Sequence, residues 1–421
     1  MSTPHSRRDV LKGAVAVAAV ASFPRRAAGQ ESTMQARTRI DGVLKRAVDA
    51  KDVPGVVAMA ATDKGVLYEG AFGRRELGKD APMSLDTVVW IASMTKAITA
   101  TAAMQLVERG KLALDAPASQ LAPGLAKAQV LEGFDAAGQP RLRAPKRPIT
   151  LRHLLTHTAG FGYEIWREEV AKYQAATNTP GITTCTNAAL TTPLLFDPGE
   201  GWEYGINIDW AGKIVEAASG QKLDAYFQQN ILGPLGMKDT SFSLSASQRA
   251  RLASVHQRDE KGALAPIEFG LPENPEFLMG GGGLNGTAPD YLAFAQMILH
   301  GGRFNGAQVL RPETVDHMAQ NHIGPLEIGA MKSAMPSLSH DIELFPGMSK
   351  KWGLSFLINT APLPTGRAAG SLAWAGLANT YFWIDRSKRV CGVFLSQVLP
   401  FYDPTAIDLL TRFETEIYRA L

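Results

Sequence analysis

Hydrophobic residues near both ends of the chain form short β-rich runs separated by turn sequences. Residues 55–73 hold two such runs on either side of TDKG, which predicts a β-hairpin. Residues 380–398 hold two more around DRSK and predict a second hairpin. The sequence between these hairpins is mostly helical in pattern, so we expect one sheet to which both ends of the chain contribute.

Apolar residues recur at helical spacing elsewhere. Residues 404–421 predict a closing helix, and residues 210–237 predict two helices that Gly220 separates. An early helix is expected over residues 36–50, where the apolar positions are Ile40, Val43, Leu44, Ala47 and Val48.

Two further segments carry turn and cap signals. A helix is expected over residues 288–302, because Thr287 stands three residues before Asp290 and Pro289 suits a first turn. Residues 130–150 contain AAGQP and predict a small surface hairpin or flap.

These patterns predict a mixed α/β fold in which helices flank an antiparallel sheet. We expect the α/β part to comprise residues from about 30–110 and 275–421. A mostly helical region of about 111–274 would be inserted between them, with a site where the two parts meet.

The first 29 residues look like a bacterial twin-arginine export signal. Arg7 and Arg8 stand in SRRDVLK, with Val10 where a Phe is usual, and the apolar stretch GAVAVAAVASF and the small residues AAG follow. The alternative is an N-terminal helix with chance arginines. We expect a removed signal and a periplasmic or secreted mature protein, residues 30–421.

Composition narrows the class of protein. The chain has 421 residues, 45% of them hydrophobic and 20% charged, which is typical of a globular protein. Residues 1–29 hold five Arg or Lys and one Asp, so the net charge of +3 leaves −1 for the remainder. That remainder has no electrostatic footprint for nucleic acid. No apolar run reaches the roughly 18 residues that a membrane span needs. We expect Cys185 and Cys391 to be free and buried, although the periplasm would permit a disulfide.

Ser93 and Lys96 are the first candidates for catalysis. They stand one turn apart at the start of a predicted helix over residues 93–109. A serine in this position presents its own N–H toward a developing oxyanion, and the helix dipole favours that charge. Lys96 can act as its base only when neutral, so burial or nearby cations must lower the pKa of Lys96.

Spacing alone does not settle these roles. The chain has 21 Ser and 18 Lys, so roughly one S-x-x-K is expected by chance. Ser219 and Lys222 form a second match around Gly220, at a predicted surface turn. A helix-start serine beside an exposed lysine therefore remains an alternative for Ser93 and Lys96.

Four longer blocks resemble the serine β-lactamase and penicillin-binding-protein superfamily, and fit best its class C-like branch with the family VIII esterases. The blocks begin with ASMTKAITATAAMQLVERGKL, ITLRHLLTHTAGFGY, DPGEGWEYGINIDWAGKIV and GGGGLNGTAPDYLAFAQMI, in the family's order. The resemblance covers residues of roughly 35–420. It implies the β-lactamase/transpeptidase-like fold and makes Ser93 the nucleophile and Lys96 its base.

The same resemblance assigns further site residues. Tyr204 matches the tyrosine of Tyr-x-Asn and would be the second base or proton shuttle, its pKa lowered by Lys96. Ile206 stands where the family has Asn, and Asn207 comes one residue late, which puts in doubt the amide contact that β-lactamases make there.

The third family element matches Trp-x-Gly, as in the esterase branch. Its residues Trp374, Ala375 and Gly376 would bind substrate, with the backbone of Gly376 close to it. The N–H groups of Ser93 and Leu377 would form the oxyanion hole. Trp374 replaces the usual cation, which favours apolar, uncharged acyl or alcohol groups.

The remaining motifs give weaker evidence for a functional site. His153 and His157 are four residues apart and could share a helix face, but they lack the Glu of H-E-x-x-H, so we expect structural hydrogen bonds rather than zinc. GGGG at 280–283 is not a phosphate loop; the resemblance makes it a flexible turn beside the site. There is no G-x-S-x-G nucleophile elbow. Four aromatic residues could line an acyl pocket or simply belong to the core: Phe161, Tyr163, Trp166 and Trp352.

We therefore expect a serine hydrolase that cleaves small carboxylic esters of short to medium acyl chain through a Ser93 acyl-enzyme, with no cofactor or metal. A β-lactamase or a D-alanyl-peptide hydrolase is the alternative among enzymes. A non-catalytic cell-wall or penicillin-binding sensor module is the alternative of another class. The sequence does not give the oligomeric state.

Overall fold

The computed structural model describes residues 25–421, and the predicted Arg7–Arg8 pair lies outside them. A seven-stranded sheet forms the centre of the molecule, with its strands in the order β11-β12-β13-β14-β15-β1-β2 and every neighbouring pair antiparallel. The bounds are β1 Gly55–Thr62, β2 Gly65–Gly73, β11 Lys350–Trp352, β12 Leu357–Asn359, β13 Leu372–Gly376, β14 Thr380–Asp385 and β15 Val390–Leu395.

Both ends of the chain contribute to this sheet, as predicted. The TDKG turn joins β1 to β2, and the DRSK turn joins β14 to β15. β15 then pairs with β1, with Val57 opposite Leu395 and Thr62 opposite Val390. Every residue of β14 and of β15 is buried. Strands buried on both faces have continuous apolar sequences rather than alternating ones, which is what residues 381–384 and 390–395 show on either side of the charged turn.

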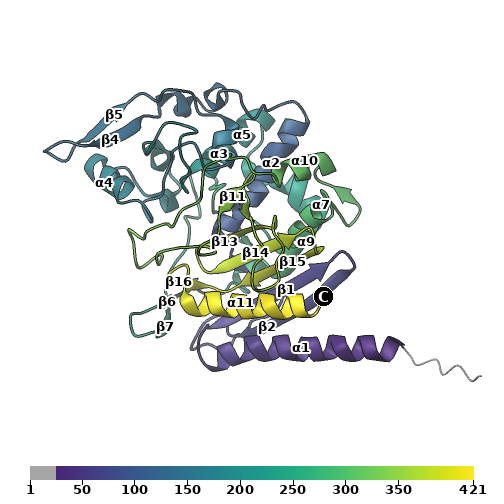
Figure 1. The fold of residues 1–421 in the computed structure, drawn as a ribbon. Coiled ribbons are helices and arrows are strands. Elements are labelled where there is room, and N and C mark those ends of the chain that lie inside the picture. The colour runs from purple at the N-terminus through teal and green to yellow at the C-terminus, as the bar shows by residue number, and fades with distance from the viewer. Residues whose placement is uncertain (1–24) are drawn as a thin grey trace, which may run out of the picture.

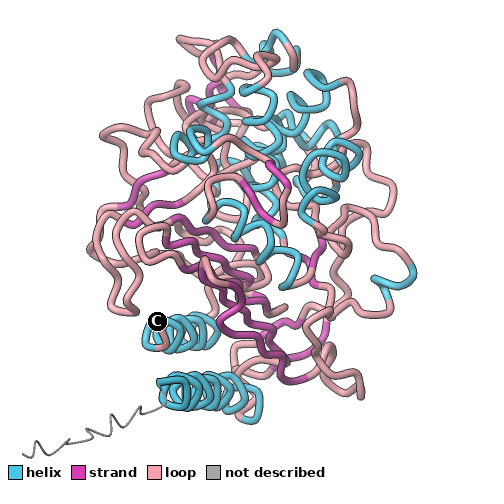
Figure 2. Tube along the Cα trace, turned by 90° about the vertical axis from the view of Figure 1, so that its right-hand side faces the viewer, coloured by secondary structure: helices cyan, strands magenta, loops and turns pink. Residues whose placement is uncertain are grey.

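Helices cover both faces of the sheet (Figures 1 and 2). Helices α1 (Arg25–Asp49) and α11 (Pro404–Arg419) lie together on one face. Leu409, Phe413 and Ile417 of α11 are fully buried, one helical turn apart. On the opposite face, α9 (Ala288–Leu299) packs against β14, β15 and β1.

The helical layer lies beyond α9, on the side of the sheet away from α11 (Figure 1). Its central contact is between α2 (Thr95–Glu108) and α5 (Asn207–Ser219), and twelve consecutive residues of α2 are buried, from Thr95 to Leu106. The other helices are α3 Leu151–Leu155, α4 Glu168–Thr177, α6 Leu223–Phe227, α7 Gly233–Leu235, α8 Ala246–Arg249 and α10 Pro312–Met318.

Several sequence signals act as expected at helix ends. Thr287 accepts the N–H of Asp290 at 3.4 Å and caps α9. Gly220 ends α5 in the left-handed conformation, with φ of 72°. Among the described residues, no helix has the length and apolar character of a membrane span.

The short strands form small separate sheets. β4 (Val130–Phe134) and β5 (Pro140–Arg143) make the predicted hairpin, which projects from the helical layer at the periphery of the molecule (Figure 1). β3 (Val89–Trp90) pairs with β8 (Asn285–Gly286). The remaining pairs are β6 His256–Arg258 with β7 Leu264–Pro266 and with β16 Val398–Leu399, and β9 Arg303–Phe304 with β10 Ala307–Gln308.

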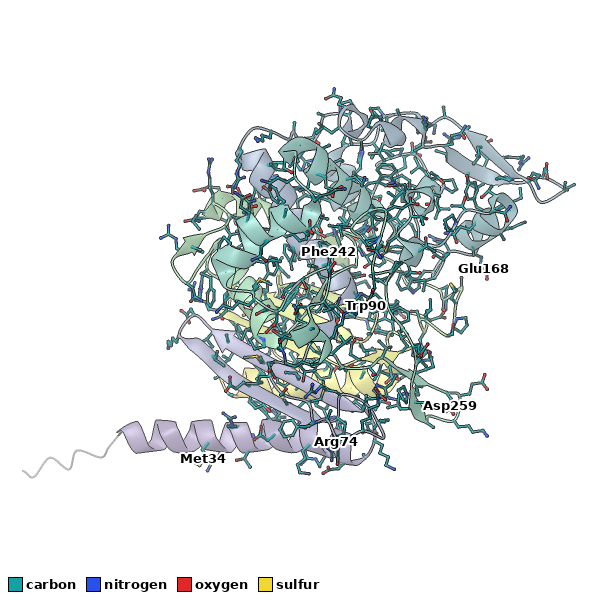
Figure 3. The ribbon with its side chains drawn as sticks, turned by 180° about the vertical axis from the view of Figure 1, so that it is seen from behind. Met34, Arg74, Trp90, Glu168, Phe242 and Asp259 are labelled. Carbon is teal, nitrogen blue, oxygen red and sulfur yellow. The ribbon has the colours of Figure 1, made fainter. Side chains whose placement is uncertain are left out.

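Figure 3 shows Trp90 of β3 near the middle of the molecule, whereas Asp259 lies at the tip of the projecting β6–β7 hairpin. The indole of Trp90 donates to the carbonyl of Gly282 at 2.8 Å, and its ring lies 4.8 Å from that of Phe269. These contacts fix the strand that leads directly into the Ser93 segment.

Cys185 and Cys391 are both buried and are not bonded to each other. Burial raises the pKa of each thiol to about 12. Both thiols are therefore protonated and inert at neutral pH.

Candidate active site

The Ser93 segment is a strained turn between a strand and a helix. Residues Ala92–Met94 form a single 3₁₀ turn that runs into α2. Ala92 has φ of 46°, in the left-handed region that residues with a Cβ rarely occupy. Such strain is typical of positions that must present a neighbouring side chain in one direction. Ser93 is only partly buried, whereas Lys96 is 1% exposed and Tyr204 is 2% exposed.

Lys96 contacts Ser93 directly. Its Nζ lies 3.0 Å from Ser93 Oγ, 3.1 Å from the Tyr163 hydroxyl and 2.6 Å from the carbonyl oxygen of Gly281. A neutral amine has two N–H groups and one lone pair. The Gly281 carbonyl has no proton to donate and therefore accepts one N–H of the amine. The Tyr163 oxygen can accept the other N–H. The lone pair is then free to take the proton of Ser93.

Burial supplies the neutral form of Lys96. It lowers the pKa of Lys96 from 10.5 to about 7, although the Asp209 carboxylate acts in the opposite direction. The sequence argument required either burial or nearby cations to lower this pKa. In the structure it is burial that lowers the pKa of Lys96.

Tyr204 lies beside this pair in a different electrostatic state from the one expected. Lys96 Nζ is 4.7 Å from the centre of its ring. Burial raises the pKa of Tyr204 above its usual value of 10, although hydrogen bonds from Ser93 and Trp374 act to lower it. The expectation that Lys96 lowers this pKa is wrong, because desolvation of the phenolate outweighs the favourable contacts. Tyr204 is a neutral phenol at neutral pH.

Strand β13 forms the wall opposite α2. The indole of Trp374 donates to the Tyr204 hydroxyl at 3.0 Å, and the two rings are 4.9 Å apart. Ala375 pairs with Tyr381 of β14, and the alternation of side chains along a strand directs it to the face opposite Trp374. Leu377 follows the strand and is 9% exposed. Its N–H remains a predicted oxyanion donor.

At Gly376, strand β13 approaches other parts of the protein closely. A Cβ at this position would lie 2.3 Å from the carbonyl oxygen of Ile91 and 2.3 Å from Thr380 Oγ1. Only glycine allows β13 to approach the Ser93 segment this closely. The structure thus accounts for this glycine through its contact with Ile91, the residue two before Ser93, and the approach of substrate to the Gly376 backbone stays a prediction.

Aromatic side chains surround Tyr204. The ring centres of His157, Tyr163 and Trp166 lie 4.8, 5.4 and 5.5 Å from that of Tyr204. We call these residues, together with Trp202, Trp352 and Trp374, the aromatic cluster; they are linked by ring contacts of 4.6 to 6.4 Å. Tyr163, Trp166 and Trp352 of the cluster are among the candidates for an acyl pocket. The structure brings these three together around Tyr204 and Trp374, and of the three Tyr163 contacts Lys96 directly.

Two histidines have structural partners. α3 ends at Leu155 and His157 has φ of 58°, so His153 and His157 do not share a helix face. His153 Nδ1 accepts the N–H of Thr150 at 3.2 Å as part of the cap of α3. Among the side chains that the structure describes, no group of His, Cys, Asp and Glu is arranged to hold a metal.

The side chain of Asn207 also contacts other residues of the protein. Its side-chain Nδ2 lies 3.0 Å from His157 Nδ1, 3.2 Å from the Phe161 carbonyl and 3.3 Å from the Glu203 carbonyl. The side chain is fully buried. This amide is therefore not available to a substrate, which explains the departure from Tyr-x-Asn.

The 280–283 loop lies beside the site, as the resemblance implies, and it is held by contacts with two helices. All four glycines are buried, and the loop is held to α2 by Thr99, whose hydroxyl donates to the Gly280 carbonyl at 2.7 Å. Gly281 donates its N–H to Asp209 Oδ1 at 2.8 Å. The loop thus forms the floor beneath Lys96.

Sequence reasoning did not single out Asp209, and it named Tyr163 only as a candidate for an acyl pocket, not as a partner of Lys96. Asp209 is a fully buried carboxyl in the first turn of α5. The available signal was an acidic residue inside the apolar stretch INIDWAGKIV, because such a residue is rarely buried without a partner. Tyr163 gave no polar signal, since its contact with Lys96 arises only in the folded chain.

Known proteins share this architecture. Monacolin J acid methylbutanoyltransferase of Aspergillus terreus is 32% identical over 90% of this chain and 95% of its own. Lovastatin esterase of Penicillium rubens is 34% identical over 90% of this chain and 98% of its own. Among solved structures, unliganded simvastatin synthase from Aspergillus terreus superposes with a TM-score of 0.78 at 32% identity, covering 91% of this chain and 98% of that one.

A more distant structure shows the same fold. EstCE1, described as a hydrolase with promiscuous acyltransferase activity, has a TM-score of 0.71 at 24% identity and covers 93% of this chain and all of that one. The Beta-lactamase family model matches residues 40–415, which include every site residue described above. The chain belongs to the Beta-lactamase family and is an enzyme of the serine hydrolase type.

Proposed function

We propose that the protein cleaves carboxylic esters through an acyl-enzyme on Ser93. The observation that carries this proposal is the 3.0 Å contact between Ser93 Oγ and a buried Lys96 whose pKa lies near 7. A serine becomes a nucleophile when an adjacent base takes its proton, and a base with a pKa near the working pH is the most effective.

In the acylation step, neutral Lys96 takes the proton of Ser93 while Oγ attacks the ester carbonyl. The N–H groups of Ser93 and Leu377 would hold the oxyanion that forms. Tyr204 is a phenol at neutral pH, so it is suited to give its proton to the departing alkoxide and to regain one from the Lys96 ammonium. The ester C–O bond breaks, the alcohol leaves, and the acyl group stays on Ser93.

In the deacylation step, water attacks the acyl-enzyme and the same groups act in reverse. Tyr204 takes the proton of the water as it gives its own to Lys96, and the Lys96 ammonium then returns a proton to Ser93 Oγ as the C–O bond to Ser93 breaks and the acid is released. Each cycle therefore consumes one water and needs no group beyond these side chains and the two amides.

The walls of the site favour an uncharged, apolar substrate. The aromatic cluster, which includes Trp374, offers no cation to a substrate carboxylate. This disfavours efficient cleavage of β-lactams and of D-alanyl peptides. An acyl chain of short to medium length would lie against indole rings. One relative is named lovastatin esterase and another monacolin J acid methylbutanoyltransferase, and these names support ester cleavage or the transfer of a small acyl group.

Acyl transfer to an alcohol is a second candidate. It is favoured by the relatives named as methylbutanoyltransferases and by the aromatic rings packed around Tyr204 and Trp374, which make this side of the site apolar. The chemistry is the same until the acyl-enzyme, and the competition between water and alcohol decides the product.

The test measures hydrolysis of p-nitrophenyl esters of graded acyl length, with a chromogenic cephalosporin alongside and with an added alcohol acceptor. Ser93→Ala and Lys96→Ala should each lower ester turnover by about 10³-fold or more while the protein stays folded. Ser219→Ala is the matched control, because it changes the other S-x-x-K serine at the end of α5 and should leave turnover unchanged.

The outcomes separate the alternatives. Near-wild-type turnover in Ser93→Ala would refute the proposal. Cephalosporin turnover above ester turnover would indicate a β-lactamase, and a stable mass increase with penicillin but no turnover would indicate a sensor module. Ester product formed from the added alcohol would identify the protein as a transferase.

A further inference from the structure

Asp209 is a buried carboxylate with an incomplete set of partners. It is fully buried, and its Oδ1 accepts the N–H of Gly281 at 2.8 Å. Its Oδ2 has no partner at hydrogen-bond geometry among the residues that the structure describes, although the Tyr163 hydroxyl lies near enough to lower the pKa of the carboxyl. An unpartnered charged oxygen in the interior is costly and requires a nearby positive charge or another explanation.

Gly281 links this carboxylate to Lys96. Its N–H faces Asp209, and its carbonyl accepts the Lys96 amine at 2.6 Å. A Cβ at position 281 would lie 2.5 Å from Asp209 Oδ2, so the carboxylate is packed directly against this residue. A movement of Asp209 would therefore move the carbonyl that orients the Lys96 amine.

The charge of Asp209 also acts on Lys96 through space. It raises the pKa of Lys96 against the effect of burial, and Lys96 in turn lowers the pKa of the Asp209 carboxyl, which burial raises. The other titratable groups that face the pair are neutral at pH 7, since burial raises the pKa of the tyrosines and the thiol and lowers that of the imidazole; they are Tyr163, Tyr204, Cys185 and His157. Asp209 is thus the one charge opposed to the Lys96 ammonium among the described residues.

We propose that Asp209 is a positioning residue for the base Lys96: it fixes the Gly281 carbonyl that orients the amine, and it stabilises the ammonium formed when Ser93 loses its proton. This inference rests on the proposed function, because it gives Asp209 a role only if Lys96 is the base. Asp209 itself touches neither the substrate nor the reacting atoms.

A purely structural role is the competing explanation, in which Asp209 only satisfies the Gly281 N–H. The two roles differ in the pH dependence of turnover. If the charge acts on Lys96, its removal lowers the pKa of Lys96 and moves the acid limb of kcat/KM to lower pH. A structural anchor would alter stability and leave the limb in place.

The experiment compares wild type, Asp209→Asn and Asp290→Asn in p-nitrophenyl ester hydrolysis between pH 5 and 9, with thermal melts of each. Asp209→Asn keeps an acceptor for the Gly281 N–H and removes the charge. Asp290→Asn is the matched control, because Asp290 is also buried with a raised pKa and accepts the Asp239 N–H and the Thr240 hydroxyl at 2.8 Å, but serves the start of α9.

We expect the acid limb of Asp209→Asn to move down by about one pH unit and its plateau to fall by about tenfold, because the Lys96 ammonium loses its counter-charge. Asp290→Asn should keep the wild-type limb. If Asp209→Asn does not fold, Asp209→Ser serves the same measurement, since it removes the charge and leaves a hydroxyl and room for water.

An unshifted limb in a folded Asp209 variant would overturn the inference while leaving the proposed function intact. Failure of the proposed function is recognised separately, by turnover that persists in Ser93→Ala or by an absence of ester turnover in wild type.

Discussion

At the scale of single residues, the protonation of Lys96 should control the rate. Because burial lowers its pKa to about 7, the neutral form is lost as the pH falls below that value. We therefore expect kcat/KM for an ester without ionisable groups to fall about tenfold per pH unit below pH 7 and to level off above it. A profile that stays flat down to pH 5 would show that Lys96 is not the titrating base.

Trp374 tests two roles at the same scale. Its indole donates to the Tyr204 hydroxyl at 3.0 Å, and its ring was expected to contact the substrate. Trp374→Phe keeps a large aromatic ring and removes the donor. If the donor matters most, kcat falls by about threefold to tenfold and KM stays near the wild-type value. A raised KM with unchanged kcat would instead assign Trp374 to substrate binding.

The sequence led to Ser93, Lys96, Tyr204 and Trp374 because each stands in a local motif. The pKa of Tyr204 was mispredicted, since it depends on how deeply the aromatic cluster buries the phenol. Asp209 was missed for a related reason. It acts through Gly281, which is 72 residues away in the chain, and no local pattern records that contact.

At the scale of elements, Gly376 joins strand β13 to the Ser93 turn. In Gly376→Ala the new Cβ would meet the Ile91 carbonyl at 2.3 Å, so the strand and the turn must separate. We expect a loss of roughly 1–3 kcal/mol in the free energy of unfolding. Ester turnover should fall at least tenfold, because both predicted oxyanion amides lie beside this contact.

Gly329→Ala is the matched control for that substitution. A Cβ at Gly329 meets nothing within 4 Å, and its φ is not in the left-handed region. Its thermal midpoint and turnover should stay close to wild type. If Gly376→Ala behaves like Gly329→Ala in both measurements, close approach to Ile91 does not explain the glycine.

The elements were predictable where the pattern was local. Both hairpins and the helices α9 and α11 follow from turn residues and apolar spacing within a few positions. Residues 319–349 contain no helix or strand and gave no pattern to interpret. Their path is set by distant partners, such as Ser339, which accepts the Trp166 indole N–H at 2.9 Å.

At the scale of the whole molecule, the order of the strands in the sheet could not be predicted from local sequence patterns. The β-rich runs and their turns predicted two hairpins and suggested a shared sheet. The pairing of β15 with β1 brings residues together from opposite ends of the chain, with Val57 opposite Leu395. No local pattern records that neighbour relation, because most of the chain lies between the two strands.

The packing of α1 on β2 and α11 predicts how far the chain can be shortened from its N-terminus. We propose that residues 1–29 are an export signal, so a chain that begins at residue 30 should fold and keep wild-type turnover. The described side chains of α1 become buried only from Ala36 onward. A chain that begins at residue 51 also loses Ile40, Val43 and Leu44, each of which contributes about 1.5–3 kcal/mol through burial.

That loss is comparable with the entire stability of a typical domain, roughly 5–15 kcal/mol, and it uncovers the face of β2 and α11 that α1 covers. We therefore expect the chain beginning at residue 51 to be insoluble or to melt far below the chain beginning at residue 30. Circular dichroism melts and ester turnover of the two chains provide the comparison. Equal melting temperatures would mean that α1 is dispensable and that the sheet and α11 hold the fold without it. A loss of turnover already in the chain beginning at residue 30 would show that residues 1–29 belong to the working enzyme rather than to a removed signal.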